Sequence, residues 1–287
     1  MQIKNPKLVS FETYRFQILP ISKSIQLTID NEVTSYEDLV EKKNQFLADV
    51  LNKPKLTFEH SKSKITLRFD GTDDNIFLFR INVLRKLKRH TPDFKEEQIE
   101  DYPAVTIAIH NDKTKQIIAI EKNSKAFAHP ETVSHIIENN LNRHLKPKNL
   151  AIYIEPIYSK EDFWEIVEKY ENRIKQLDFE LIRPNMSNIS SKIDEQLKAL
   201  ENSVDAHKLN LKLQSSKEAN LIIDRENAQI DGLVDYASQG GGNISFKVKG
   251  LRKKVKTAKT PTEINVDEME LKNLSPQELI NILKLLL

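Results

Sequence analysis

The pattern of apolar and polar residues predicts mainly β-strands in the first 120 residues. Apolar side chains alternate with polar ones, and this period of two places every second residue on one face of a strand. The dipeptide Asp70-Gly71 indicates a turn between strands. The strands predicted in this way are 11–18, 25–29, 56–58, 65–69, a longer apolar run at 76–84, and a hairpin formed by 105–109 and 116–120.

Apolar residues three and four positions apart predict two amphipathic helices in the same half of the chain. The first covers residues 35–51; it is capped by Thr34 or Ser35 and ends before Pro54. The second covers residues 130–145, where the apolar residues form one stripe. The sequence shows no internal repeat.

The second half of the chain begins with a predicted strand, helix and strand. Residues 150–157 and 174–182 alternate as strands, and a capping box at residues 159–162 precedes the apolar face of a helix at 163–170. The elements predicted after them are a helix at 189–204, a strand at 209–213, a helix at 220–236 and a strand at 245–248. We expect an α+β fold with antiparallel or mixed sheets and packed helices. Its two domains are an antiparallel domain, 1–146, and a domain with the β-α-β unit, 147–287.

Composition removes several classes of protein. The chain has 287 residues, a formal net charge of +2 and no cysteine, which excludes a disulfide scaffold, a thiolate metal site and a cysteine nucleophile. Its 6 glycines form neither of the common phosphate-binding loop motifs. No signal-like N-terminus and no run of about 18 apolar residues is present. We therefore expect a cytoplasmic protein.

A basic run near the C-terminus is the strongest candidate for a binding site. Seven lysines and arginines occur between residues 247 and 259 without an acidic residue among them. A phosphate backbone would neutralise these charges and release its counterions, so DNA is the natural ligand. The alternative interpretation of the basic run is a solvated basic loop. The neighbouring glycines, Gly240–Gly242, either expose backbone N–H groups to phosphate or form a flexible connector. The candidate DNA-binding residues are Lys247, Lys249, Arg252, Lys253, Lys254, Lys256 and Lys259.

A second basic segment follows the apolar run at 76–84. If the strand continues to His90, it protrudes, with Arg80, Lys86 and Lys88 on one face and Arg85 and Arg89 on the other. The alternative is an edge strand that its charges protect from aggregation, and the acidic residues at 96–101 offer local compensation. The candidate DNA-binding residues here are Arg80, Arg85, Lys86, Lys88 and Arg89.

No catalytic residue, metal site or cofactor is predicted. His135 and His144 lie on opposite faces of one helix and cannot share a metal. Two groups of carboxylates could form a nuclease centre, namely Glu155 with Asp162 and the cluster at residues 70–74. Both groups fit structural roles in turns and helix caps better.

The C-terminal helix is more apolar than a surface helix needs to be. Seven of the nine residues from 279 to 287 are apolar. It therefore packs either into its own domain or against a second copy or a partner subunit. The candidate interface residues are Leu279, Ile282, Leu283 and Leu286.

The segments 150–164, 177–185 and 209–213 carry a resemblance to a known family. A strand containing Ile154-Glu155-Pro156, a charged turn, a helix and further strands follow one another in the same order. This order resembles an uncharacterised bacterial family linked to phage defence and, more distantly, the RexA phage-exclusion proteins. The resemblance covers residues 100–260, and the first hundred residues have no counterpart. The turn at 183–185 is a structural marker of the resemblance.

The resemblance implies an α+β protein of a mobile defence locus that binds DNA with little sequence preference, often as a dimer, and acts with a partner protein. Together with the basic run, it predicts a sequence-nonspecific DNA-binding protein of an anti-phage system. The expected partners are DNA, a membrane or effector subunit, and a second copy of the chain. The alternatives are a nuclease or other effector of the same system, and an interaction scaffold.

Overall fold

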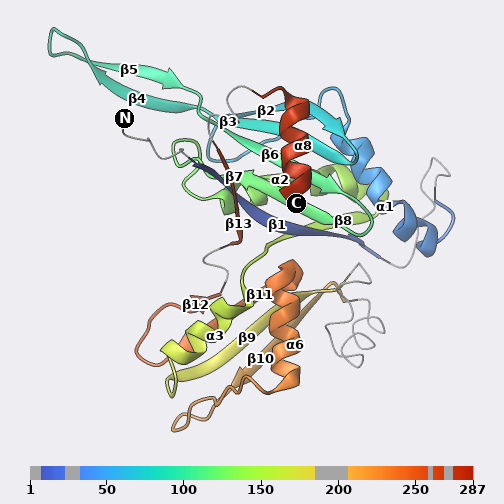
Figure 1. The fold of residues 1–287 in the computed structure, drawn as a ribbon, viewed down its shortest axis with the longest axis vertical. Coiled ribbons are helices and arrows are strands. Elements are labelled where there is room, and N and C mark those ends of the chain that lie inside the picture. The colour runs from blue at the N-terminus through green and yellow to red at the C-terminus, as the bar shows by residue number, and fades with distance from the viewer. Residues whose placement is uncertain (1–7, 23–32, 185–205, 258–260, 268–273, 287) are drawn as a thin grey trace, which may run out of the picture. The chain divides into compact units, whose positions relative to one another are not determined.

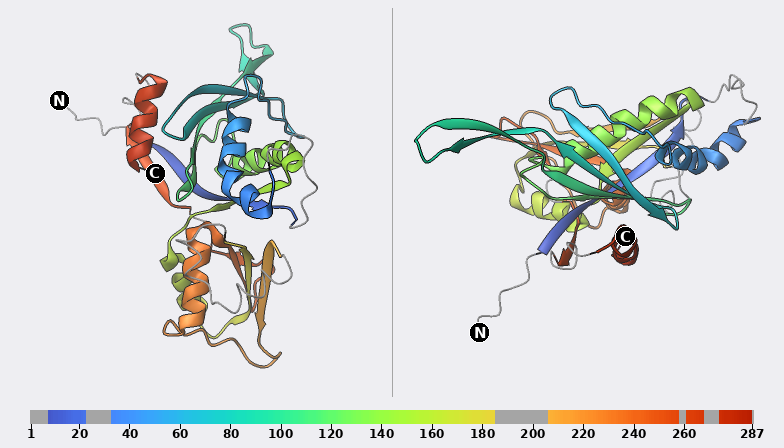
Figure 2. Two further views of the ribbon diagram at one scale, coloured as in Figure 1. Left: turned by 90° about the vertical axis from the view of Figure 1, so that its right-hand side faces the viewer. Right: turned by 90° about the horizontal axis from the view of Figure 1, so that it is seen from above.

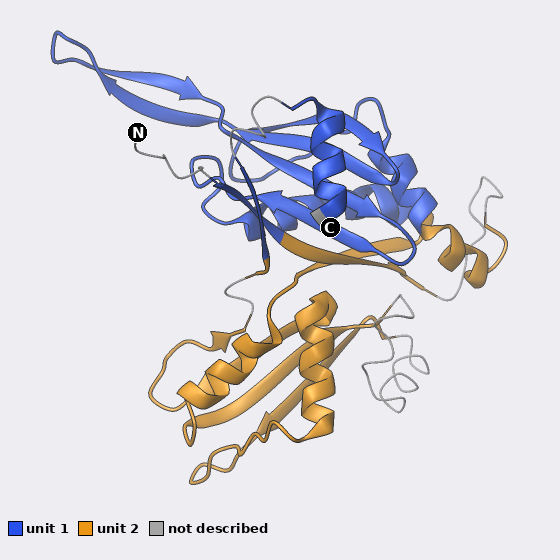
Figure 3. Ribbon diagram, viewed as in Figure 1, with its two compact units in different colours: residues 1–12, 44–147, 263–287 blue, residues 13–43, 148–262 orange. Residues whose placement is uncertain are grey.

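The chain folds into two compact units, which are coloured separately in Figure 3. The computed structural model describes residues 8–22, 33–184, 206–257, 261–267 and 274–286. Unit 1 comprises residues 1–12, 44–147 and 263–287, and unit 2 comprises residues 13–43 and 148–262. The predicted boundary between residues 146 and 147 lies close to the boundary near residue 147 in the structure. Residues 13–43, expected in the N-terminal domain, belong to unit 2, and residues 263–287, expected in the C-terminal domain, belong to unit 1.

The chain forms helices and antiparallel sheets, which confirms the predicted α+β class (Figure 1). The helices are α1 (Tyr36–Leu51), α2 (Pro130–Leu145), α3 (Lys160–Lys169), α6 (Ala228–Tyr236) and α8 (Pro276–Leu286). The strands are β1 (Leu8–Pro20), β2 (Ile65–Asp73), β3 (Ile76–Val83), β4 (Arg85–His90), β5 (Glu96–Asp101), β6 (Ala104–Asn111), β7 (Gln116–Glu121), β8 (Leu150–Pro156), β9 (Ile174–Ile182), β10 (Lys208–Gln214), β11 (Gly242–Val248), β12 (Val255–Lys256) and β13 (Glu263–Asp267). Among the described helices, none is both long and apolar enough to cross a membrane.

The largest sheet has the strand order β13-β1-β7-β6-β3-β2, with β8 paired to β1. The predicted hairpin at 105–120 is confirmed as β6 and β7, and the predicted helix at 130–145 as α2. α2 and α8 lie on opposite faces of this sheet (Figure 2). On the α8 side, Leu279, Ile280 and Leu283 pack with Ile76 and Leu78 of β3 in the core of unit 1.

The turn between β2 and β3 differs from the predicted one. It lies at Asp74-Asn75, where both residues have positive φ (45° and 64°), as a two-residue hairpin turn of the primed type requires. Gly71 instead belongs to β2, next to a register shift after Phe69. Residues 56–58 form no strand, although Phe58 is buried. The predicted strand at 25–29 and helix at 189–204 lie outside the described residues.

The predicted helix at 35–51 is confirmed as α1, and its apolar face contains a lysine. Ser35 caps the helix by accepting a hydrogen bond from the Asp38 N–H (3.1 Å). Lys43 lies on the same helical face as Leu39 and Leu47 and is only 6% exposed. Burial lowers the pKa of Lys43 to about 8, because the charged form loses its hydration.

We expect the stability of the protein to rise between pH 7 and pH 9.5 because of Lys43. The unfolded chain, with its higher lysine pKa, binds more protons than the folded chain in this range, so increasing pH favours the folded state. The gain is about 2 kcal/mol at pH 9.5. Urea unfolding across this range should show the rise in the wild type and in Lys53→Met, a control at an exposed lysine, but not in Lys43→Met. An unchanged pH profile in Lys43→Met would assign the rise to another group.

Unit 2 contains a four-stranded antiparallel sheet with the order β10-β9-β11-β12. Its core packs Phe163 and Trp164 of α3 and Val234 of α6 against Phe179 of β9 and Phe246 of β11. The helices therefore cover one face of this sheet (Figures 1 and 2).

Two predictions for unit 2 need correction. The strand–helix–strand order at 150–182 is present, but β8 pairs with β1 while β9 pairs with β10 and β11, so the two strands do not form one parallel unit. The helix predicted from residue 220 begins at Ala228, because the Asn227 side chain caps it by accepting from the Gln229 and Ile230 N–H groups.

Candidate nucleic-acid interface

The face of the four-stranded sheet opposite α3 and α6 is polar. Strand alternation directs Leu177, Phe179 and Leu181 of β9 into the core and Asp178 and Glu180 to the other side. The antiparallel register aligns Lys212, Asp178, Ser245 and Lys256 across the four strands in one row. We call this surface the polar face; it consists of Gln176, Asp178, Glu180, Lys208, Asn210, Lys212, Gln214, Asn243, Ser245, Lys247, Lys254 and Lys256.

The polar face has an excess of positive charge. It contains five lysines and two acidic residues. Asp178 pairs with Lys254 (Nζ to Oδ2, 2.8 Å) and Glu180 with Lys208 (Nζ to Oε1, 3.3 Å). Within the described part of the chain, the other three lysines, Lys212, Lys247 and Lys256, form no ion pair.

Asp178 is the fixed anion at the centre of this face. The Gln176 amide donates to both of its carboxylate oxygens, at 2.7 and 2.8 Å, in addition to the Lys254 ammonium group. Partial burial opposes ionisation, but the hydrogen bonds from Lys254 and Gln176 and the charges of Lys254 and Lys212 outweigh it, so the pKa of Asp178 is lowered. Asp178 therefore stays charged and orients Lys254.

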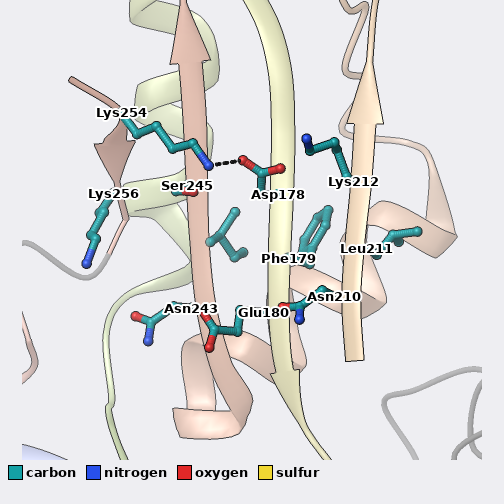
Figure 4. A pocket seen from close by; sticks show the side chains of 11 residues that line it. Asp178, Phe179, Glu180, Asn210, Leu211, Lys212, Asn243, Ser245, Lys254 and Lys256 are labelled. Atoms are coloured by element: carbon teal, nitrogen blue, oxygen red, sulfur yellow. Dashed lines mark hydrogen bonds and ion pairs between the residues drawn. The ribbon is translucent and has the colours of Figure 1, made fainter. Parts of the chain in front are cut away.

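A hollow of about 290 Å³ lies on the polar face (Figure 4). Lys212 borders it on one side of Asp178, and Lys254 and Lys256 border it on the other side. Asn210, Asn243 and Ser245 also line it and add neutral hydrogen-bonding groups. Ammonium groups at the border of this hollow suit a phosphate group, because each donates charge-assisted hydrogen bonds.

The structure divides the predicted basic run between two locations. Lys247, Lys254 and Lys256 lie on the polar face, whereas Lys249, Arg252 and Lys253 are exposed in the connection between β11 and β12. Lys259 lies outside the described residues. Lys208 and Lys212 of β10 were not among the predicted residues, although the strict alternation of residues 208–214 would have placed both on one face.

The second predicted basic set is largely compensated by neighbouring groups. Arg80 pairs with Asp70 (Nε to Oδ2, 2.9 Å), and the Arg85 guanidinium donates to the Ala126 carbonyl oxygen. Lys88 and Arg89 bond to Glu96 (2.8 Å) and Glu97 (2.6 Å), and Lys86 lies opposite Glu100. These contacts correspond to the alternative interpretation of this segment, in which neighbouring groups compensate the charges of its basic residues.

The three consecutive glycines serve close packing. A Cβ atom at Gly240 would overlap the Cβ of Arg15, and one at Gly241 would overlap the ring of Tyr236. At Gly242 it would overlap the carbonyl oxygen of Glu180. These contacts leave no room for a phosphate against the glycine Cα atoms, so neither the phosphate loop nor the flexible connector describes this segment.

The candidate carboxylates are held in structural contacts. Asp70 accepts from Arg68 (2.6 Å), and Asp74 from Lys284, whose hydrogen bond and charge lower the pKa of Asp74. Glu155 accepts from the Asn243 amide. Burial raises the pKa of Asp162, and the charge of Glu165 adds to this shift. Among the described residues, no group of three histidine or acidic side chains could hold a metal ion.

The predicted interface residues of the C-terminal helix have different environments. Leu279 and Leu283 are buried in the core of unit 1, and Ile282 is partly buried against the same core. This is the alternative in which the helix packs within its own chain. Leu285, not among the predicted residues, is 88% exposed. The side chain of Leu286 lies outside the described part of the chain.

A family model described as Domain of unknown function (DUF4747) matches residues 95–284. The chain belongs to this family. The DUF4747 match includes every strand of the polar face and most of α8, and it begins just before β5. No curated protein and no solved structure matches the chain.

Proposed function

We propose that this chain is a sequence-nonspecific DNA-binding protein that contacts the phosphate backbone through the polar face. The observation that supports this best is the group of three unpaired lysines, Lys212, Lys247 and Lys256, on three different strands of one sheet. Lys212 and Lys256 stand three strand spacings apart in one row, about 14 Å at about 4.8 Å per strand, so their side chains can contact separate phosphates of one backbone. Neutralising these phosphates releases counterions.

The composition of the polar face supports binding without sequence preference. Its cations are all lysines, which act as flexible point charges, whereas base-specific readout commonly uses the bidentate fork of arginine. None of the twelve residues that make up the face is aromatic, so it offers no platform for base stacking. Phosphate contacts position a protein on DNA and carry no sequence information.

The wider biological role that we propose rests on the resemblance to the phage-defence family. In this proposal the protein acts in the cytoplasm as the DNA-binding component of a bacterial anti-phage system, together with a partner protein. The DNA contact is the part that the polar face supports.

We expect the triple variant Lys212→Gln, Lys247→Gln, Lys256→Gln to bind duplex DNA more weakly and with less salt dependence. Loss of three phosphate contacts should make the slope of log K against log salt shallower by about 2.7. Fluorescence anisotropy with a labelled duplex of random sequence, from about 50 to 300 mM salt, measures this slope. A second duplex of unrelated sequence should give the same affinity.

The matched control is Lys55→Gln, Lys62→Gln, Lys125→Gln, which removes three exposed lysines of unit 1 and changes the net charge equally. Its slope should stay that of the wild type. Equal losses in both triple variants would attribute the binding to net charge, and a wild type without DNA affinity would refute the proposal.

A further inference from the structure

A two-stranded arm projects from β3 and β6 of the large sheet, which belong to unit 1 (Figures 1 and 2). It consists of β4, the tip at residues 91–95, and β5, and these strands pair only with each other within the described chain. The same antiparallel register runs from β3 and β6 into the arm, through the Val83 N–H that bonds to the Pro103 carbonyl (3.1 Å). The arm is therefore a continuation of two central strands of the sheet, which holds it at its base.

One face of the arm has an apolar centre between charged pairs. Leu87 and Ile99 lie directly opposite each other across the strands and are 50% and 37% exposed. Arg85 opposes Asp101 on one side of them, and Arg89 opposes Glu97 on the other. We call this surface the Leu87 face; the opposite face holds Lys86, Lys88, His90, Glu96, Gln98 and Glu100 and has no apolar side chain.

The tip adds a second exposed apolar group. Phe94 is 96% exposed and has a φ of 58°, a backbone conformation that bulky residues rarely adopt. The turn is ordered by hydrogen bonds from the Thr91 N–H to the Lys95 carbonyl (2.9 Å) and from the Phe94 N–H to the Thr91 carbonyl (3.0 Å). Large apolar side chains that are exposed together on one projecting ribbon, as Leu87, Ile99 and Phe94 are, are typical of a surface that a partner covers.

The charges on the Leu87 face are complementary to the same face of a second copy. A two-fold axis parallel to the strands places β4 of one copy over β5 of the other. Leu87 then meets Ile99 of the second copy, Arg89 meets Glu97, and Arg85 meets Asp101. An axis perpendicular to the strands would instead oppose Arg85 and Arg89, so the charge pattern selects the first arrangement.

We propose that the arm is the contact through which two copies of this chain form a dimer, with their Leu87 faces together. Nucleic acid fits the arm less well, because the four cations of β4 are matched by the four acidic residues of β5 and the arm attracts no phosphate backbone. The Leu87 face has six residues, fewer than the roughly 20 to 30 per partner of a standard interface, so the dimer should dissociate on dilution in about the micromolar range.

Charge reversal on the Leu87 face tests the proposal. In Arg89→Glu, the introduced carboxylate would face Glu97 of the other copy, and in Glu97→Arg, the introduced guanidinium would face Arg89; each variant alone should be monomeric. In an equimolar mixture, both pairs between positions 89 and 97 of different copies have opposite charges again, so a heterodimer should form. Sedimentation velocity from about 1 to 200 µM should give twice the 33.3 kDa chain mass for the wild type and for the mixture at high concentration.

Lys88→Glu is the matched control, since it reverses a charge on the opposite face of the same strand, and it should leave the dimer unchanged. Leu87→Ser should weaken the dimer without an effect on charge. Recovery of the dimer in the mixture requires both variants to be folded, and equal thermal unfolding midpoints provide the check on each alone. A monomeric wild type at the highest concentration, dimers of either reversal variant alone, or a mixture that stays monomeric would each overturn the proposal. DNA affinity that changes with Arg89→Glu at constant mass would instead make the arm a nucleic-acid contact.

Discussion

Replacing Gly242 with alanine is expected to destabilise unit 2 by about 4 kcal/mol. Gly242 has a φ of 152° and pairs with Leu181 at the start of β11. A Cβ atom there would overlap the Glu180 carbonyl oxygen and lie 2.9 Å from the Leu181 Cα. Both are backbone atoms of the central strand β9, so neither can move without disturbing the sheet.

Urea unfolding of the full chain measures this loss, and hydrogen exchange of the β9 and β11 amides locates it. The matched control is Gly232→Ala inside α6, where φ is not positive, and where alanine should stabilise the helix by about 0.5 to 1 kcal/mol. If Gly242→Ala were as stable as Gly232→Ala, β9 and β11 would not approach each other as closely as the structure shows.

Leu283→Ala in α8 is expected to cost unit 1 about 3 kcal/mol. Leu283 is fully buried, next to Leu279 and Ile280, against residues of β1 and β3 such as Phe11 and Leu78. The helix start is secured by a capping box, in which the Ser275 N–H donates to Glu278 (2.7 Å) and the Glu278 N–H donates to Ser275 Oγ (3.3 Å).

The control for Leu283→Ala is Leu285→Ala, at the exposed leucine of the same helix, which should change stability by less than about 0.5 kcal/mol. Urea unfolding of both variants compares them directly. Equal effects at the two positions would mean that α8 does not pack on its own chain in solution, and the helix would then be available for a partner.

Local elements were predicted well where the signal lies within a few residues. The stripe of α2 and its Pro130 start, the Ser35 cap of α1 and the alternation of β6 and β7 each depend on neighbours in the sequence. The Asp74-Asn75 turn was missed because Asp70-Gly71 is the commoner turn sequence, and the pairing of β2 with β3 decided between them.

The candidate DNA site was only partly visible in the sequence. The basic run pointed to Lys247, Lys254 and Lys256, but Lys212 lies far from them along the chain and joins them only through the pairing of β10, β9 and β11. The same holds for the arm, where the cations of β4 were visible but the acidic residues that oppose them were assigned by the register with β5.

The sequence by itself determined the α+β class, most helix and strand positions, and the apolar character of the C-terminal helix, because helix caps and hydrophobic periodicity act over one or two turns of chain. Only the tertiary structure decided that β8 pairs with β1, that α8 packs in unit 1, and which charges oppose each other on the polar face and the arm. Strand partners and register depend on which distant apolar faces bury each other. Many pairings of similar strands satisfy the same local pattern, so this choice is made by the packing of the whole chain.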